Sequence, residues 1–252
     1  MNDRVLVIDI GNSMAKFAFF NGGEIENYQT YPTRSVMTKP EVVTETDLNK
    51  YFKRGIDYGA LSSVVPEATG VVKCLMKSHV RKKLFDVPDM TLKMDIDYQG
   101  VLGEDRIMGG YAARHFYGFP VIVVDVGTAL TFSLIDEKGI FRGGMISLGP
   151  YSLLKTLANR TSQIDMIDLE VPARNVGRNT EESVNAGVFW TVLGAMEYCI
   201  TRIEEFVGHP CRVVLTGGYS VFFADFIKHP VELDPFLVLR GLNVALQENI
   251  ER

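Results

Sequence analysis

The chain lacks several features that mark well-known classes of protein. It has only three cysteines, Cys74, Cys199 and Cys211, and no Cys-x-x-Cys pair, so we expect reduced thiols and a cytoplasmic location. Its four histidines are scattered and give no zinc-binding spacing. No apolar stretch approaches the length of a membrane span, and the N-terminus has no long apolar segment of the signal-peptide type. We therefore expect no membrane partner.

Positive charge is also scarce. The 26 lysines and arginines are outnumbered by 31 aspartates and glutamates, which gives a net charge of −5. A mildly acidic chain has no electrostatic footprint for DNA or RNA, so we expect no nucleic-acid partner. An anionic small molecule is still compatible with this charge, because local basic groups can bind it. With 46% hydrophobic residues in 252, the chain is long enough for one large or two ordinary domains.

Two segments of nine residues nearly repeat each other: VLVIDIGNS from Val5 to Ser13, and VIVVDVGTA from Val121 to Ala129. Each has an apolar run, an aspartate, one more apolar residue, a glycine and small polar residues. Strand-favouring residues around a turn, NGG in one case and EKG in the other, follow each copy. Both copies therefore predict a buried strand, an Asp-x-Gly turn and a β-hairpin. Neither copy contains GxGxxG, and the chain has no Gly-Lys dipeptide, which argues against Rossmann and P-loop folds.

The remaining sequence predicts helices alternating with strands, which is typical of an α/β protein. The predicted helices cover residues 44–55, 67–79, 103–118, 150–164, 179–207, 220–229 and 235–250. The predicted strands cover residues 58–65, 83–87, 91–98 and 212–218. In the first helix Thr44 and Asp47 form a predicted capping box. The segment HFYGFP near residue 117 separates two predicted lobes, 1–117 and 118–252.

The repeated turns suggest phosphate binding. Gly11 lets backbone N–H groups approach a ligand closely, and the side chains of Asn12 and Ser13 can hydrogen-bond phosphate oxygens. A carboxylate such as Asp9 repels phosphate, so a cation has to lie between them, and we expect Mg²⁺. Lys16 can neutralise phosphate charge. A single Asp-x-Gly could equally be a plain hairpin turn, but the second copy, with Asp125 and Thr128, favours the functional interpretation.

Three further segments have both a structural and a chemical interpretation. In GEDR, residues 103–106, the acidic pair can simply complement a helix N-terminus, or Asp105 can accept a proton from an alcohol while Arg106 binds an anion. In GRNTEE, residues 177–182, a capping box is favoured. In TGG, residues 216–218, a tight turn competes with close approach to an adenosine. The residues alone thus predict a two-lobed, phosphate-binding protein and no particular substrate.

Taken together, these segments resemble the type III pantothenate kinases, a family of the acetate and sugar kinase, Hsp70 and actin superfamily. DIGNS with Lys16, SSVVPE (62–67), GEDR, DVGTALT, GGMIS, GRNTEES and LTGG occur in the family's order over nearly the whole chain. Each motif is weak alone, but the ordered set is specific. The resemblance implies an α/β fold of two actin-like (ribonuclease H-like) lobes related by internal duplication. It also implies ATP-dependent phosphorylation of pantothenate to 4′-phosphopantothenate in coenzyme A synthesis.

The resemblance also implies roles for individual residues. It implies ATP binding by Asp9, Ile10, Gly11, Asn12, Ser13, Met14, Ala15, Lys16 and Thr128. It implies pantothenate binding by Tyr98, Gly103, Glu104, Asp105 and Arg106, with Thr180 contributed across a homodimer interface. Asp105 matches the family's proton acceptor. Asp125 matches the ligand of a monovalent cation, K⁺ or NH₄⁺, which departs from the Mg²⁺ role that the repeat alone suggests for both aspartates.

Several positions depart from the family pattern. Ser13 stands where threonine is usual, and Glu104 replaces a common alanine and adds a charge beside Asp105, which raises the pKa of Asp105 if the two side chains converge. The segment between Tyr98 and Gly103 is shortened to QGVL. Tyr219 follows TGG where an acidic residue is frequent.

Two other functions compete with pantothenate phosphorylation. One is another phosphotransferase of the superfamily, acting on acetate, a sugar or polyphosphate. The other is a non-catalytic nucleotide-binding regulator. Retention of Asp9, Asp105, Arg106, Asp125 and Thr180 together favours an enzyme. All three interpretations assume that the two Asp-x-Gly turns face one nucleotide cleft.

Overall fold

The structure is a computed structural model that describes residues 4–46 and 48–251. The chain forms two compact units. The first unit contains the chain up to Asp95, Gln99–His115, and the chain from Leu237 onward; the second contains Ile96–Tyr98 and Phe116–Phe236. Each unit is built on one five-stranded sheet.

The sheet of the first unit joins an antiparallel meander to two parallel strands. Its strands are β1 (Val5–Ile10), β2 (Met14–Asn21), β3 (Glu24–Pro32), β4 (Ile56–Ser63) and β5 (Val80–Asp86). They lie in the order β3-β2-β1-β4-β5, with β1 at the centre. β2 pairs antiparallel with both β1 and β3, whereas β4 runs parallel to β1 and β5 runs parallel to β4. All six residues of β1 are buried, as expected for a central strand covered on both faces.

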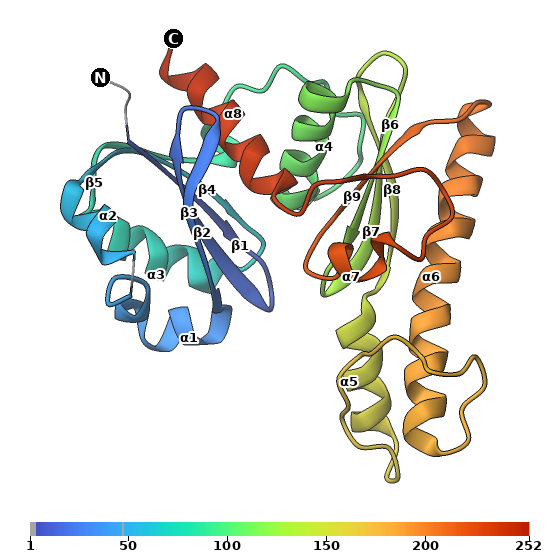
Figure 1. Ribbon diagram of the computed structural model, residues 1–252. Coiled ribbons are helices and arrows are strands. Elements are labelled where there is room, and N and C mark those ends of the chain that lie inside the picture. The colour runs from blue at the N-terminus through green and yellow to red at the C-terminus, as the bar shows by residue number, and fades with distance from the viewer. Residues whose placement is uncertain (1–3, 47, 252) are drawn as a thin grey trace. The chain divides into compact units, whose positions relative to one another are not determined.

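Helices cover both faces of this sheet (Figure 1). They are α1 (Thr33–Thr38), α2 (Asn49–Arg54), α3 (Pro66–Met76), α4 (Glu104–Tyr117) and α8 (Leu237–Ile250), with 3₁₀ turns at Pro40–Val43 and Val87–Asp89. Side chains from α1, α2 and α3 pack against Leu6, Ile8 and Ile10 in one apolar core. Since side chains alternate along a strand, Val5, Val7 and Asp9 point to the opposite face. Helix α8 packs against β1 and β4.

The sheet of the second unit repeats the same design. Its strands are β6 (Val121–Val126), β7 (Ala129–Ile135), β8 (Phe141–Leu148), β9 (Arg212–Thr216) and β10 (Glu232–Leu233). Read as β8-β7-β6-β9-β10, their order and directions match those of the first sheet. The predicted α/β class, with two duplicated lobes that each open with a hairpin after an Asp-x-Gly turn, is therefore confirmed.

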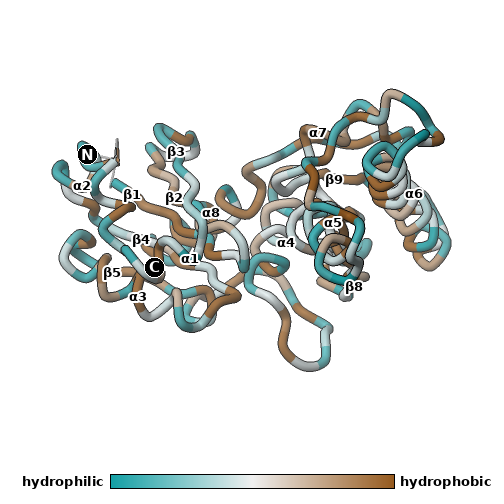
Figure 2. The backbone as a smooth tube through the Cα atoms, turned by 90° about the horizontal axis from the view of Figure 1, so that it is seen from below, coloured by the Kyte–Doolittle hydropathy of each residue, from teal (hydrophilic) through white to brown (hydrophobic). Residues whose placement is uncertain are grey.

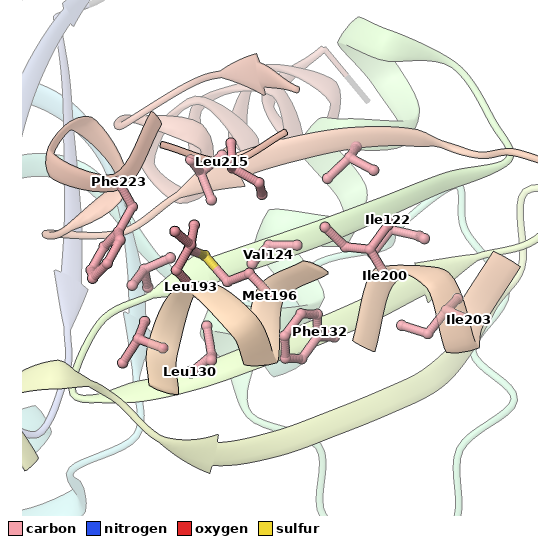
Figure 3. Close-up of a cluster of buried hydrophobic side chains, with 14 of the residues drawn as sticks. Ile122, Val124, Leu130, Phe132, Leu193, Met196, Ile200, Ile203, Leu215 and Phe223 are labelled. Carbon is pink, nitrogen blue, oxygen red and sulfur yellow. The ribbon is translucent and has the colours of Figure 1, made fainter. Parts of the chain in front are cut away.

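A long helix closes the core of the second unit. The helices of this unit are α5 (Pro150–Arg160), α6 (Thr180–Val207) and α7 (Ser220–Ala224). Figure 3 shows Leu193, Met196 and Ile200 of α6 facing apolar side chains of β6 and β7, and the same residues share one buried cluster. In Figure 2 the tube of α6 carries both hydrophobic and hydrophilic stretches, in keeping with one buried face.

The compact units and the predicted lobes differ at the C-terminus. The predicted boundary near residue 117 lies beside the change of unit between His115 and Phe116. Helix α8, however, belongs to the first unit by its contacts with β1 and β4. The division of the sequence into lobes 1–117 and 118–252 stays a prediction.

Some predicted elements are shorter than expected or absent. Residues 91–98 form no strand, because only Ile96 makes an isolated bridge, to Phe141. The helix predicted over 44–55 is confined to α2, and the capping box predicted for it includes Asp47, which lies outside the described residues. The helix predicted over 220–229 is only the short α7, and that over 150–164 ends at Arg160. No helix in the described part of the chain is long and apolar enough to cross a membrane.

Candidate active site

Asp9 sits near the end of β1 between two polar side chains. The register places Lys16 of β2 on one side of it and Ser62 of β4 on the other. Lys16 Nζ lies 3.3 Å from Asp9 Oδ2, and Ser62 Oγ lies 3.4 Å from Asp9 Oδ1. Asp9 is 4% exposed, and a buried carboxylate is stabilised by a nearby positive charge. Lys16 supplies that charge and remains partly accessible.

The turn after Asp9 is held closed from outside the turn. Gly11 N donates to Met14 O at 3.0 Å. Thr33, the first residue of α1, donates its hydroxyl to Gly11 O at 2.7 Å and its N–H to Ser13 O at 3.0 Å. The turn is therefore rigid, while the Asn12 side chain is exposed. Sequence reasoning missed Thr33, because no spacing rule links it to a turn some twenty residues earlier.

The acidic pair Glu104 and Asp105 opens helix α4, as predicted. Asp105 Oδ1 accepts a hydrogen bond from the N–H of Arg106 at 2.8 Å. A Cβ on Gly103 would lie 2.5 Å from the same carboxylate oxygen, so a side chain there would displace the Asp105 carboxylate from this position. The Glu104 carboxylate points elsewhere and accepts the N–H of Ser63, at the end of β4, at 2.8 Å. Arg106 is almost fully buried.

The environment of Asp105 favours its protonated form. Burial raises the pKa of Asp105, and the negative charge of Asp9 raises it further, against the opposing effects of the Arg106 N–H bond and of the Arg106 and Lys16 charges. Of two interacting carboxylates, Asp9 thus has a lysine beside it, whereas Asp105 has a raised pKa. Such a difference in environment is typical of acid–base sites. Burial also raises the pKa of Glu104, with smaller increases from Asp86 and Asp105. The main carboxylate acting on Asp105 is therefore Asp9, whereas Glu104 was the neighbour expected from sequence.

The turn after Asp125 resembles the turn after Asp9 in its strand partners but is shorter. Asp125 is paired in register with Thr131 of β7 and Thr216 of β9, so a hydroxyl residue stands on the parallel strand in both copies. Gly127 N donates to Ala129 O at 2.9 Å, which makes this turn one residue shorter than the first. The shorter turn brings Thr131, a neutral residue, to the place that Lys16 has beside Asp9.

Backbone packs tightly around Asp125. A Cβ on Gly217, whose φ is +96°, would lie 2.3 Å from Asp125 Oδ1, and one on Gly127 would lie 3.2 Å away. The carbonyl of the exposed Thr128 accepts hydrogen bonds from Gly149 N and from Ser152 Oγ, at 3.0 and 2.7 Å. Sequence reasoning missed Ser152, which fixes this turn as Thr33 fixes the first.

Tyr98 belongs to the second unit and packs against its edge strand, β8. Its ring meets Phe141 edge-on, with 6.4 Å between centroids, and lies 3.2 Å from where a Cβ on Gly143 would be. The preceding Asp97 bonds through its N–H to Phe141 O and through its carboxylate to Arg142. The shortened segment after Tyr98 therefore starts from an anchored residue.

Thr180 begins α6 and lines a cavity of about 820 Å³ between α5 and α6. The predicted capping box precedes it: Asn179 Oδ1 accepts the Glu182 N–H at 2.8 Å. Glu182 returns a bond to the N–H of Arg178, one residue earlier than the standard box. Its lining combines apolar residues, such as Leu153, Leu157, Val184 and Val188, with polar ones, such as Thr156, Ser183 and Thr191.

The predicted site residues thus form two groups. Asp9 to Lys16 and Gly103 to Arg106 come together in the first unit, where Asp105 interacts electrostatically with Asp9 and Lys16. Asp125 and Thr128 share the turn of the second unit, while Tyr98 and Thr180 lie at its edge strand and its long helix. That the two turns face one cleft stays a prediction.

Protein side chains alone do not form a multidentate metal centre in the described part of the chain: no group of three or more His, Cys, Asp or Glu residues is placed to hold an ion. Magnesium in nucleotide enzymes is typically held by one or two carboxylates and the substrate phosphates, which Asp9 fits.

Two sheets with the same strand order, each carrying an Asp-x-Gly turn at the end of its central strand, define the actin-like class of α/β proteins. A family model described as type III pantothenate kinase matches residues 5–202. The type III pantothenate kinase of Rubrobacter xylanophilus is 33% identical over 265 residues, which cover 98% of this chain and 99% of the relative. The chain belongs to the type III pantothenate kinase family.

Solved structures support the fold. A Campylobacter jejuni protein described as a conserved putative Baf family transcriptional activator superposes with a TM-score of 0.60 at 22% identity, covering 98% of this chain and all of that one. The activator of 2-hydroxyisocaproyl-CoA dehydratase from Clostridium difficile, solved with bound ADPNP, gives 0.59 at 13% identity, covering 98% and 96%. Identities this low show a shared fold and no shared activity.

Proposed function

We propose that this protein transfers the γ-phosphoryl group of ATP to the primary hydroxyl of pantothenate. The product is 4′-phosphopantothenate, and the reaction is the first step of coenzyme A biosynthesis. The observation that carries the proposal is the pairing of Asp105 with Asp9 and Lys16, in a chain that belongs to the type III pantothenate kinase family. One carboxylate is compensated by lysine, and the other has a raised pKa, which suits a proton acceptor.

Asp105 is the base that orients and deprotonates the pantothenate hydroxyl. A carboxylate of raised pKa is a stronger base than a free one. The Arg106 N–H bond and the Gly103 turn hold this carboxylate in one orientation. Phosphoryl transfer depends mainly on such positioning and on charge stabilisation.

The turn from Asp9 to Lys16 binds the ATP phosphates. Its rigid backbone offers N–H groups near the phosphates, and Lys16 neutralises phosphate charge. A bound Mg²⁺ supplies charge neutralisation between phosphate oxygens, and Asp9 is the residue that would hold it. Thr128 of the second turn makes a further ATP contact.

The neutral partner of Asp125 supports a separate ion role for the second turn. In register, Thr131 stands beside Asp125 where Lys16 stands beside Asp9, so the two turns differ in the residue opposite the aspartate. We assign to Asp125 a monovalent cation, K⁺ or NH₄⁺. By family membership we assign pantothenate binding to Gly103, Glu104, Arg106 and Tyr98, and the guanidinium of Arg106 matches the pantothenate carboxylate.

The exposed face of α6 supports a homodimer in which Thr180 reaches the partner's site. Trp190, Tyr198 and Phe206 are 42%, 67% and 82% exposed on this helix. On the same helix, a Cβ added to Gly187 or Gly194 would meet no atom within 4 Å. The glycines allow a second helix to approach closely, and the exposed apolar side chains offer it a surface to pack against. A cyclic dimer is the commonest assembly of this kind.

A coupled ADP-release assay tests the function. We expect ADP release that requires pantothenate and increases when K⁺ replaces Na⁺, with acetate, sugars and polyphosphate inactive as acceptors. Turnover of one of those acceptors instead would identify another phosphotransferase. No turnover with ATP, Mg²⁺, K⁺ and pantothenate would favour a nucleotide-binding regulator.

A further inference from the structure

Glu104 joins two segments of the candidate site that are far apart in sequence. Its Oε2 accepts the backbone N–H of Ser63, 41 positions earlier, at 2.8 Å. The neighbouring Ser62 contacts Asp9 Oδ1 through its hydroxyl. A short series of contacts therefore runs from Asp9 through Ser62 and Ser63 to Glu104 and so to Asp105.

The end of β4 is itself fixed. Val64 N donates to Ile10 O at 3.1 Å, which ties the residue after β4 to the end of β1. Ser63 Oγ accepts the N–H of Val65 at 3.1 Å and closes the turn into α3. The strand end is a rigid base, and the bond to Glu104 connects the start of α4 to it.

An ordinary helix-start role does not explain the placement of Glu104. An acidic residue in the first turn complements the helix dipole while remaining in solvent. Glu104 is instead half-buried, where burial, Asp86 and Asp105 all oppose its ionisation. Gly103, directly before α4, has no side chain that could cap the helix. The Glu104 carboxylate instead links the first turn of α4 to the sheet, through the N–H of Ser63.

We propose that Glu104 is a positioning residue: by accepting the Ser63 N–H it fixes the first turn of α4 to the end of β4 and so sets the place of Asp105 beside Asp9. The importance of that spacing for turnover rests on the proposed role of Asp105. The carboxylate itself faces the backbone of β4, so binding of pantothenate is not its main task.

Three variants test the link. Glu104→Ala removes the acceptor, Glu104→Asp shortens it by one methylene, and Glu104→Gln keeps an amide oxygen that can accept the same N–H. We expect Glu104→Ala and Glu104→Asp to lower kcat roughly 10- to 100-fold, as small misplacements of a catalytic group do. Glu104→Gln should rescue kcat to within about 3-fold of the parent, and KM for pantothenate and ATP should change less than about 3-fold in all three.

A matched control and an activity-independent signal complete the test. Glu67→Ala removes an exposed acidic residue from the first turn of α3 and should leave kcat unchanged. In ¹H–¹⁵N spectra the Ser63 amide proton should move upfield in Glu104→Ala and keep its position in Glu104→Gln.

Specific results overturn the proposal. It is wrong if Glu104→Ala keeps the parental kcat, if Glu104→Gln is as slow as Glu104→Ala, or if the loss appears only in KM for pantothenate. If Glu104→Ala does not fold, Glu104→Gln decides: a parental kcat with an unchanged Ser63 amide signal supports the proposal, and a slow variant overturns it. A parent chain without kinase activity would defeat the proposed function, while the Ser63 signal still shows whether Glu104 fixes the helix start.

Discussion

Two carboxylates of the first unit show how single residues are prepared for chemistry. Asp9 has a lysine 3.3 Å away, whereas Asp105 is partly buried, repelled by Asp9 and hydrogen-bonded by the N–H of Arg106. A group placed like Asp105 reduces the stability of the fold and increases basicity. Stability and activity should therefore respond in opposite directions when its charge is removed.

We expect Asp105→Asn to lower kcat by roughly 10²–10⁴-fold, the usual contribution of a general base, while ATP still binds. The pKa of Asp105 is raised in the folded state, so the unfolded chain releases this proton at a lower pH than the folded one does. The free energy of unfolding therefore falls as the pH rises above the unfolded pKa, and the loss is complete above the folded pKa. The variant should then be more stable than the parent at pH 8, and the gain should vanish below the pKa of 3.8 that the carboxyl has in the unfolded chain. Thermal unfolding at several pH values and steady-state kinetics measure both. Full activity in Asp105→Asn would remove the assigned base.

Asp136 of the second unit is expected to behave in the opposite way. Although burial raises its pKa, hydrogen bonds from Ile140 N, Arg142 and Lys138 N lower the pKa overall. The lowered pKa stabilises the fold above the unfolded value of 3.8, and this is lost as the pH falls through the folded pKa. We expect Asp136→Ala to cost about 2 kcal/mol at pH 7, since two backbone N–H groups lose a charged acceptor, and less at pH 3. Urea unfolding at both pH values measures the difference, and an equal cost at both would contradict it.

Residue-level prediction from sequence worked where a motif carries its own chemistry. The aspartates and glycines of the repeated turns could be found because they are close in sequence and occur twice. Thr33, Ser62 and Ser152 could not, because their roles come from strand register and helix docking that only the fold creates. For the same reason, the sequence suggested Glu104 as the charge acting on Asp105, whereas Asp9 is the larger influence.

At the scale of elements, the packing of α8 on α4 positions the helix that carries Asp105. A Cβ on Gly241 of α8 would lie 2.2 Å from Met108 O of α4, so the two backbones touch. The helices are also joined by Tyr111 Oη, which donates to Glu248 at 2.6 Å. Helix α4 is thus fixed at its first turn by β4 and along its length by α8.

We expect Gly241→Ala to destabilise the protein by about 1–3 kcal/mol, because the added methyl group forces the helices apart. Activity should fall with it, since the start of α4 moves. Gly70→Ala in α3, where a Cβ would meet no atom within 4 Å, is the matched control and should stabilise by about 0.5–1 kcal/mol through helix propensity. Chemical denaturation of both variants tests the contrast. Equal effects of the two substitutions would mean that the helix contact is not tight.

Elements with a strong apolar period and clear end signals were predictable, and α6 begins and ends within a residue of its prediction. Residues 91–98 were not, because alternating apolar side chains there suggest a strand while no neighbouring strand pairs with them beyond Ile96. Their backbone is instead held by single contacts, such as Asn249 with the N–H and carbonyl of Thr91. A strand requires a partner, and local sequence does not supply one.

At the scale of the whole molecule, duplication supplies two similar turns, and small changes make them different. The second turn is one residue shorter, and Thr131 stands beside its aspartate where Lys16 stands in the first. The proposed functions of the two turns, phosphate binding beside a lysine and binding of a monovalent cation, differ in the same way. Divergence of function within a symmetric frame needs no change of strand order.

The proposed homodimer, in which two chains share each active site, can be tested by mixing two inactive variants. If Thr180 completes the site of the partner subunit, Asp105→Asn and Thr180→Arg should each be nearly inactive alone, since every site then has one defective element. Co-expressed and randomly mixed, the two chains should recover about a quarter of parental turnover, because half of the dimers are mixed and each mixed dimer has one intact site. Differently tagged chains purified in tandem isolate that mixed dimer, and Trp190→Asp, on the exposed face of α6, should abolish both dimerisation and recovery. Recovery that fails in a mixed dimer of confirmed composition would show that each chain builds its site alone.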